Sequence, residues 1–247
     1  MGGGACYIGC AGWALPLSVQ DGFTGGGTHL QRYATRLHAA EINSSFHRPH
    51  QREVYSRWAD SVPASFRFCV KLPKTITHVH KLLRCDVLLD EFLTQAGGLG
   101  PRLGCLLVQL PPSLAFDERA ASDFFDALRR RWHGEVSAEP RHASWFGAEA
   151  DELLSRHRIA RVLADPVRHE AVAWPGGWPG LVYLRLHGSP KVYYSAYGPD
   201  LLSTLAGRIA LALRESRAVW CIFDNTASGA AAHNALALQQ ALDKELA

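Results

Sequence analysis

The sequence is poor in methionine and lysine, with one Met and five Lys in 247 residues. It has no apolar run long enough to cross a bilayer, although 47% of its residues are hydrophobic, so we expect no membrane partner. This composition also excludes a disordered chain and a collagen-like repeat. A chain of this length and hydrophobicity can bury a large core.

The charge balance is close to neutral. The formal net charge is +3, from 26 basic and 23 acidic residues, and this excess is too small to indicate nucleic acid by itself. Arginine outnumbers lysine by 21 to five. Arginine binds carboxylates and phosphates through two parallel hydrogen bonds, so the bias either indicates an anionic ligand or reflects composition alone.

The six cysteines indicate no metal site. Most of them lie in apolar segments, where a free cysteine behaves as a small hydrophobic residue. Cys6 and Cys10 have no second pair of ligands at zinc-finger spacing. The N-terminal segment lacks a secretory hydrophobic region and does not fit the myristoylation pattern, so we predict a reducing, cytoplasmic location.

Short apolar segments alternate with longer amphipathic ones along the chain. The apolar segments are continuous, which is typical of strands buried on both faces in a parallel sheet. The predicted strands are 7–11, 39–43, 66–71, 104–110, 135–139, 160–165, 181–187 and 218–224. The predicted helices are 29–37, 51–59, 86–96, 117–132, 148–157, 200–214 and 231–245, with Asp117 and Asp200 as N-caps.

This alternation predicts an α/β fold: a single (β/α)8 TIM barrel with parallel strands, in one domain covering residues 1–247. The segment after Asp165 is rich in proline and glycine, so we expect an irregular crossover there instead of a helix. The alternative is an open, doubly wound sheet. No G-x-G-x-x-G or Walker A motif follows a strand, which favours the barrel.

A barrel places functional residues at the carboxyl ends of its strands. Nearly every predicted strand becomes polar there. We therefore predict as catalytic candidates Glu41, Lys71, Glu139 and His187. The predicted substrate-binding residues are Trp13, Asn43, Gln109, Arg141, Arg185, Tyr194, Asp224 and Asn225.

Structural roles compete with these assignments. Asn225 could cap the following helix, and Glu139 with Arg141 could be a structural ion pair at the top of the barrel. Lys71 is harder to explain structurally, because a lysine in a buried strand is costly unless it is paired.

Seven ordered motifs resemble those of the DUF72, or YecE-like, family and span nearly the whole chain. They are IGCAGW (8–13), EINSSF (41–46), FCVKLPKTITH (68–78), QLPPS (109–113), EPRHASW (139–145), YLRLHG (183–188) and FDNTASGAAAHNA (223–235). The resemblance implies a TIM barrel and no established activity. Family members commonly have Tyr where this chain has His47, and the stretch between Trp13 and Tyr33 is shorter and richer in glycine than in many relatives.

Three hypotheses for function follow. The first is a hydrolase-type or isomerase-type enzyme acting on a phosphorylated, carboxylated or sugar-like substrate, with Lys71, Arg141 and Arg185 binding the anion. Glu139 or His187 would then act as acid or base, and Asn43, Gln109 and Asn225 would orient the substrate. If the reaction is glycoside hydrolysis, Glu41 and Glu139 are the carboxylate pair.

The second hypothesis is a barrel that binds nucleic acid or cleaves phosphodiesters, with metal dependence as a minority alternative. The third is a ligand-binding barrel without catalysis. No cofactor is predicted. The sequence does not decide the oligomeric state.

Overall fold

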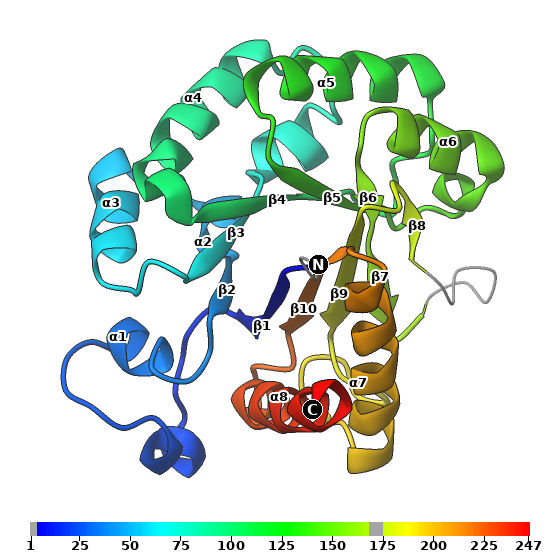
Figure 1. Ribbon diagram of the computed structural model, residues 1–247. Helices are drawn as coiled ribbons and strands as arrows, with labels where there is room; N and C mark the ends of the chain where they lie inside the picture. The colour runs from blue at the N-terminus through cyan, green and yellow to red at the C-terminus, as the bar shows by residue number, and fades with distance from the viewer. Residues whose placement is uncertain (1–3, 168–174) are drawn as a thin grey trace.

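The computed structural model describes residues 4–167 and 175–247 and has the predicted α/β barrel (Figure 1). Within these ranges a curved, mostly parallel sheet has the strand order β7-β9-β10-β1-β2-β3-β4-β5-β6-β8, and helices surround it. The strands are β1 (Cys6–Ala11), β2 (Ala39–Ile42), β3 (Arg67–Lys71), β4 (Leu103–Gln109), β5 (Glu135–Glu139), β6 (Ala160–Arg161), β7 (Leu163–Asp165), β8 (Gly176–Gly177), β9 (Leu181–Leu186) and β10 (Ala218–Phe223).

The described residues form ten strands instead of the predicted eight, because one predicted strand is split in two and β8 was not predicted. The segment predicted as one strand, 160–165, forms two short strands on either side of Val162. The first, β6, pairs with β5, whereas the second, β7, pairs with β9. Val162 therefore links the strand beside β5 to the strand beside β9, and this segment brings the two sides of the curved sheet together.

All seven predicted helices are present. They are α1 (His29–Tyr33), α3 (Arg52–Asp60), α4 (Asp86–Ala96), α5 (Glu118–Arg131), α6 (Ala148–Arg156), α7 (Pro199–Arg214) and α8 (Ala230–Leu246). Short helical turns were not predicted: η1 (Leu17–Gly22), α2 (Ser44–His47), η2 (Thr75–Val79), η3 (Gly97–Arg102) and η4 (Ala143–Phe146). Four to six residues are too few to show a helical period, so periodicity could not reveal them.

One of the two predicted N-caps is confirmed. Asp117 caps α5, because its Oδ1 accepts a hydrogen bond from the Ala120 backbone N–H at 2.8 Å. The prediction for Asp200 is wrong, since Gly198 is the N-cap of α7 and Pro199 begins the helix. Proline suits this position because its ring presets the helical φ and the missing N–H has no intrahelical partner there.

The described part of the crossover after β7 agrees with the predicted irregular connection. Residues 168–174 lie outside the described part of the chain. In the part that is described, the Asp165–Pro166 peptide bond is cis and β8 pairs antiparallel with β6. No helix occurs in the described residues between β7 and β9. In the same described ranges, no helix is long and apolar enough to span a membrane.

The core has two parts because alternate residues of each strand point to opposite faces. One set packs between the sheet and the helices and includes Ile8, Phe68 and Leu106. The other fills the barrel interior and includes Cys69, Leu107 and Tyr183. In this interior the Tyr183 and Trp220 rings stack with centroids 6.1 Å apart.

Candidate functional site

The interior changes from apolar to charged at the carboxyl ends of the strands. Every second residue of a strand faces the barrel interior. The next interior residue after Cys69 is therefore Lys71, and the next after Tyr183 is Arg185. The interior positions at this end are Glu41, Lys71, Gln109, Glu139, Arg185, His187 and Asp224, and all of them are buried. The structure thus brings these predicted residues together at one end of the barrel.

Arg185 lies at the centre of this cluster and is 1% exposed. Its guanidinium donates to both carboxylate oxygens of Glu41, from Nε at 3.0 Å and from Nη2 at 2.6 Å. It also donates to Glu139 at 2.7 Å and to Asp224 at 3.2 Å. Arg185 therefore links β2, β5, β9 and the end of β10, and three carboxylates neutralise it.

Glu139 accepts hydrogen bonds from several neighbouring side chains. Besides Arg185, the Gln109 amide donates to Oε2 at 2.8 Å and Arg141 donates to Oε1 at 3.3 Å. Burial raises the pKa of Glu139, but the charges of Arg185, His187 and Arg141 outweigh burial and hold this pKa well below 4.5. Glu139 is consequently ionised at neutral pH.

His187 lies between two carboxylates. Its Nδ1 is 2.9 Å from Asp224 Oδ2, and its Nε2 is 3.4 Å from Glu139 Oε1. Burial lowers the pKa of His187, but hydrogen bonds to Asp224 and Glu139 overcome burial and raise it above 6.5. The two carboxylates therefore stabilise the protonated imidazolium relative to a free histidine.

Lys71 has a different environment. Its ammonium lies over the Phe46 ring, 4.1 Å from the centroid, and no carboxylate in the described residues lies within ion-pair distance. Ser45 holds this arrangement, since its hydroxyl donates to the Lys71 carbonyl at 2.7 Å. Burial, followed by the charge of Arg185, lowers the pKa of Lys71 to about 8.

A pocket opens beside this cluster. About 580 Å³ of space lies between its lining residues, a figure that includes open solvent at its mouth. Three predicted residues, Glu139, Arg141 and His187, line its polar side. The opposite side comes from β7, the start of the irregular crossover, η4 and the loop after β9.

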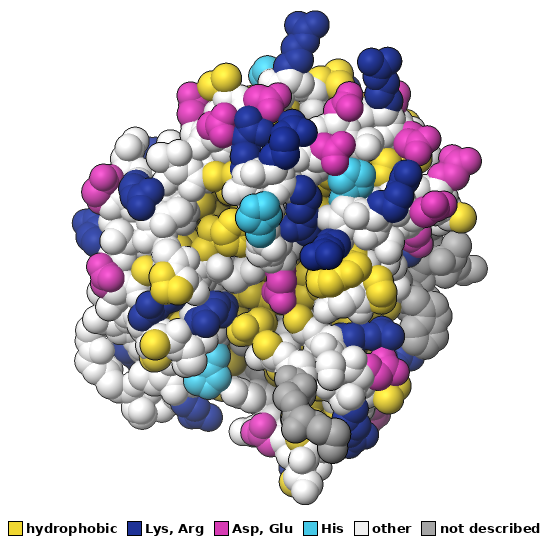
Figure 2. Space-filling model, turned by 45° about the horizontal axis from the view of Figure 1, so that its top comes forward, with side chains coloured by type: hydrophobic (Ala, Val, Ile, Leu, Met, Phe, Trp, Pro, Cys, Tyr) yellow, Lys and Arg dark blue, Asp and Glu magenta, His cyan; other side chains and the backbone are white. Residues whose placement is uncertain are grey.

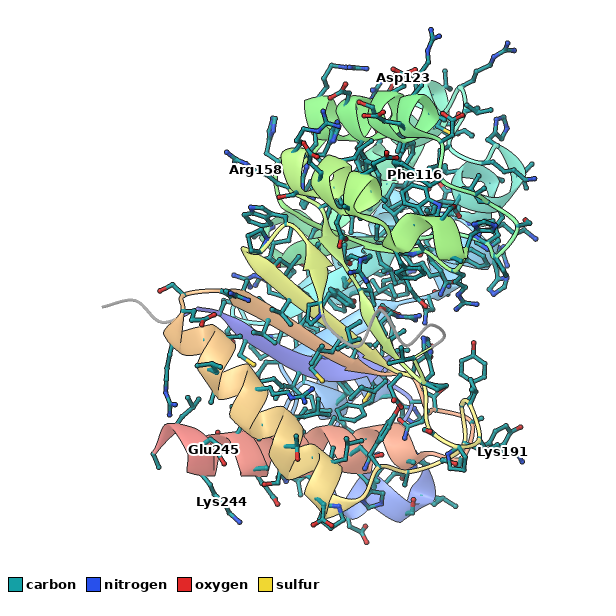
Figure 3. The ribbon with its side chains drawn as sticks, turned by 90° about the vertical axis from the view of Figure 1, so that its right-hand side faces the viewer. Phe116, Asp123, Arg158, Lys191, Lys244 and Glu245 are labelled. Carbon is teal, nitrogen blue, oxygen red and sulfur yellow. The ribbon has the colours of Figure 1, made fainter. Side chains whose placement is uncertain are left out.

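The loop after β9 is fixed at its base by a hydrogen-bonded network. The Tyr197 hydroxyl donates to Asp165 Oδ2 at 2.7 Å and accepts from the Gly188 N–H at 2.7 Å. Asn225 donates to the Ser195 carbonyl and to Asn234 Oδ1, both at 2.9 Å. Figure 3 shows the loop beyond the strand ends, where Lys191 is labelled.

Gly188 begins this loop with φ +98°. A Cβ at this position would be 2.9 Å from the Ser195 carbonyl oxygen, so a larger residue would displace the loop.

Four predicted site residues lie outside both the charged cluster and the pocket. Trp13 packs against Trp58, with ring centroids 5.1 Å apart. Tyr194 is 48% exposed and its ring contacts the Lys191 ammonium, while Asn225 holds the loop after β9. Asn43 follows β2, and its buried Oδ1 has no hydrogen-bond partner in the described residues.

Sequence reasoning missed two residues of the site. Tyr183 donates to Glu41 Oε2 at 2.8 Å. The period-two pattern that paired Arg185 with His187 could have found it, because Tyr183 is the preceding member of the series. Phe46 lies in the four-residue helix α2, which is too short for periodicity to give a signal.

In the described residues, no group of three or more His, Cys, Asp and Glu side chains has the geometry to hold a metal ion. The carboxylates Glu41, Glu139 and Asp224 are all bound by Arg185.

The fold and the site together define an α/β barrel with a charged cluster and a pocket at the carboxyl ends of its strands. The chain belongs to the family described as "Protein of unknown function DUF72", whose model matches residues 7–247. The motifs at the strand ends thus indicated the family correctly.

The chain is similar to two bacterial proteins of the UPF0759 group. The chain is 36% identical over 165 residues to UPF0759 protein YecE of Escherichia coli K12, and the match covers 64% of this chain and 58% of YecE. It is 23% identical to UPF0759 protein YunF of Bacillus subtilis, and that match covers 97% of this chain and 95% of YunF. The YecE match therefore spans somewhat more than half the length of that relative.

Solved structures of the family share the fold. A DUF72 family protein of Enterococcus faecalis has a TM-score of 0.79 at 21% identity, with 96% of this chain and 95% of that chain covered. A DUF72 family protein of Thermotoga maritima has a TM-score of 0.76 at 24% identity, with 97% and 99% covered.

Proposed function

We propose that this protein is a hydrolase-type or isomerase-type enzyme that binds a small anionic substrate in the pocket and transfers protons through His187. The observation that carries the proposal is the position of His187. Its imidazole lines the pocket while Asp224 and Glu139 hold its two nitrogens.

His187 suits proton transfer better than Glu139 does. A general acid works best when its pKa is close to the working pH, and the raised pKa of His187 moves in that direction from 6.5. Glu139 is a weak base because its pKa is well below 4.5. Asp224 accepts the Nδ1–H, so Nε2 carries the proton that the substrate receives.

Arg141 suits recognition of the anion. Its Nε is buried and has no hydrogen-bond partner in the described residues, while its Nη2 contacts Glu139. A phosphate or carboxylate in the pocket would give this guanidinium a second partner. Lys71 adds positive charge at the same end of the barrel. Burial lowers the pKa of His78, and the charges of Lys71 and Arg141 lower it further, so both cations lie near His78.

Glu41 and Arg185 have supporting roles in this proposal. Both are fully buried and neither lines the pocket. Glu41 neutralises Arg185. Arg185 donates to Oε2 of Glu139 and so fixes this carboxylate, whose Oε1 faces His187. Both are therefore positioning residues in this proposal. A glycosidase reaction with Glu41 as one of the two catalytic carboxylates is not favoured.

The size of the pocket favours a small ligand over a nucleic acid. A single-stranded nucleic acid needs a groove that follows several phosphates. On the face shown in Figure 2, basic and acidic side chains are interspersed, so that face does not present a continuous basic stripe.

The test is a turnover screen with phosphate esters, carboxylic acids and sugar phosphates, measured by phosphate release and by solvent-deuterium incorporation. We expect His187→Gln to lower kcat by about 10²-fold or more and Arg141→Gln chiefly to raise KM. His133→Gln is the matched control, because His133 is exposed and does not line the pocket.

Two results would contradict the proposal. One is binding of anions by the wild-type protein without turnover of any compound, which is the behaviour of a ligand-binding barrel. The other is equal kcat for His187→Gln and His133→Gln.

A further inference from the structure

The pocket has two chemically different sides. Glu139, Arg141 and His187 form the polar side. The other side consists of apolar side chains from β7, the crossover, η4 and the loop after β9. Its main members are Val162, Ala164, Pro166, Phe146, Val192 and Tyr193.

The polar side can hold one compact anionic group. Arg141 lines this side, and its side chain is 20% exposed. Glu139 occupies the back of this side, where its carboxylate is already bound by Arg185, Gln109 and Arg141. A second anion in the pocket would meet the negative charge of this carboxylate, so a single anionic group fits best.

The apolar side includes a rim of exposed hydrophobic residues. Val167, Val192 and Tyr193 are 40%, 39% and 43% exposed, although each lines the pocket. The Tyr193 ring stands at 85° to the His187 ring, with centroids 5.8 Å apart. An apolar body next to the anionic group would remove these side chains from water, and that removal favours binding.

A sugar does not suit this side of the pocket. Its hydroxyl groups need hydrogen-bond partners when they leave water, and an unsatisfied hydroxyl lowers affinity. Among the described residues on the apolar side, only Tyr193 has a side-chain hydrogen-bonding group. A planar aromatic body needs no such partners and can stack against the tyrosine ring.

We propose that the substrate of this pocket is an aromatic compound with a single phosphate or carboxylate group, which Arg141 and His187 bind while Tyr193 and Val192 cover the ring. This inference rests on the proposed function and specifies its substrate class. It separates aromatic acids from the sugar phosphates that the polar residues alone would also accept.

The experiment compares three probes on the full chain by isothermal titration calorimetry: inorganic phosphate, phenyl phosphate and ribose 5-phosphate. We expect phenyl phosphate to bind at least about tenfold more tightly than ribose 5-phosphate, because only the phenyl ring buries the apolar side. Tyr193→Ala should reduce this preference at least about threefold and leave the affinity for inorganic phosphate unchanged.

Tyr194→Ala is the matched control. Tyr194 is the next residue in the same loop and is similarly exposed, but it does not line the pocket, so its substitution should leave the preference intact. Circular dichroism of both variants checks that they fold.

Equal affinity for phenyl phosphate and ribose 5-phosphate would overturn the inference, as would equal effects of the two tyrosine substitutions. If inorganic phosphate binds in either case, the proposed anionic site survives and only the aromatic substrate class is wrong. If none of the three probes binds, both proposals are wrong.

Discussion

Arg185 shows how the interior of this barrel accommodates a fully buried charge. A buried guanidinium is expensive to remove from water unless carboxylates surround it. Here Glu41, Glu139 and Asp224 accept its hydrogen bonds from three other parts of the barrel. The sequence shows an arginine at a strand end, but it does not show that three distant carboxylates share it.

Replacing Arg185 with methionine is expected to lower the free energy of unfolding by about 3–5 kcal/mol, because three buried carboxylates lose their cation. Urea denaturation measures the change. Arg217→Met is the control, since Arg217 pairs with Glu215 at an exposed site and should change stability by less than about 1 kcal/mol. Equal losses for the two variants would contradict this account of Arg185.

Lys71 is expected to cost stability. Its pKa is lowered to about 8 from the ordinary 10.5, so between these values the unfolded chain binds more protons than the native one. The free energy of unfolding should therefore rise with pH across this window.

Lys71→Met removes the charge and keeps most of the stem, so at pH 7 it should be more stable than wild type by about 1–3 kcal/mol. The difference should shrink as pH rises from 8 to 10.5, which urea denaturation at several pH values measures. A difference that is independent of pH would show that the titration of Lys71 is not its cause.

At the scale of elements, the pattern of apolar residues predicted the long helices and the strands well. α5 is an example, since apolar residues at helical spacing follow the Asp117 cap. Short turns such as α2 were missed because their position depends on contacts across the barrel. Ser45 in α2 donates to the carbonyl of Lys71, a residue 26 positions away.

The two aspartates at helix starts provide a paired test. Asp117→Ala should lower the free energy of unfolding by about 1 kcal/mol, because it removes the acceptor for the Ala120 N–H. Asp200→Ala should cost only a few tenths of a kcal/mol, since Asp200 lies in the first turn of α7 and interacts with the helix dipole alone. Thermal denaturation of the two variants measures the difference, and a larger loss for Asp200→Ala would contradict the assigned caps.

At the scale of the whole molecule, the barrel encloses an apolar interior core below the charged cluster, and this enclosure buries several cysteines. Cys69 and Cys105 lie inside the barrel, Cys221 faces the helices, and all three are fully buried. Reagents can therefore reach these thiols only when the sheet opens.

The native protein should show no rapidly reacting thiol toward a bulky aromatic disulfide. Five of its six cysteines are buried, and burial raises the pKa of half-buried Cys6 to about 12, which disfavours the reactive thiolate. All six should react in denaturant, and spectrophotometric titration counts them. Rapid reaction of two or more thiols in the native protein would show that the barrel opens locally.

The amino-acid sequence by itself determined the α/β barrel, the order of its long elements, the family, and the end of the barrel that carries the charged residues. These features follow from hydrophobic periodicity and from motifs at strand ends, which are properties of neighbouring residues. The tertiary structure decided which charged groups meet. It placed Glu41 on Arg185, left Lys71 without a carboxylate at ion-pair distance among the described residues, and put Tyr193 but not Tyr194 at the pocket. Such pairings depend on strand register and loop path across the barrel, and local sequence does not fix them.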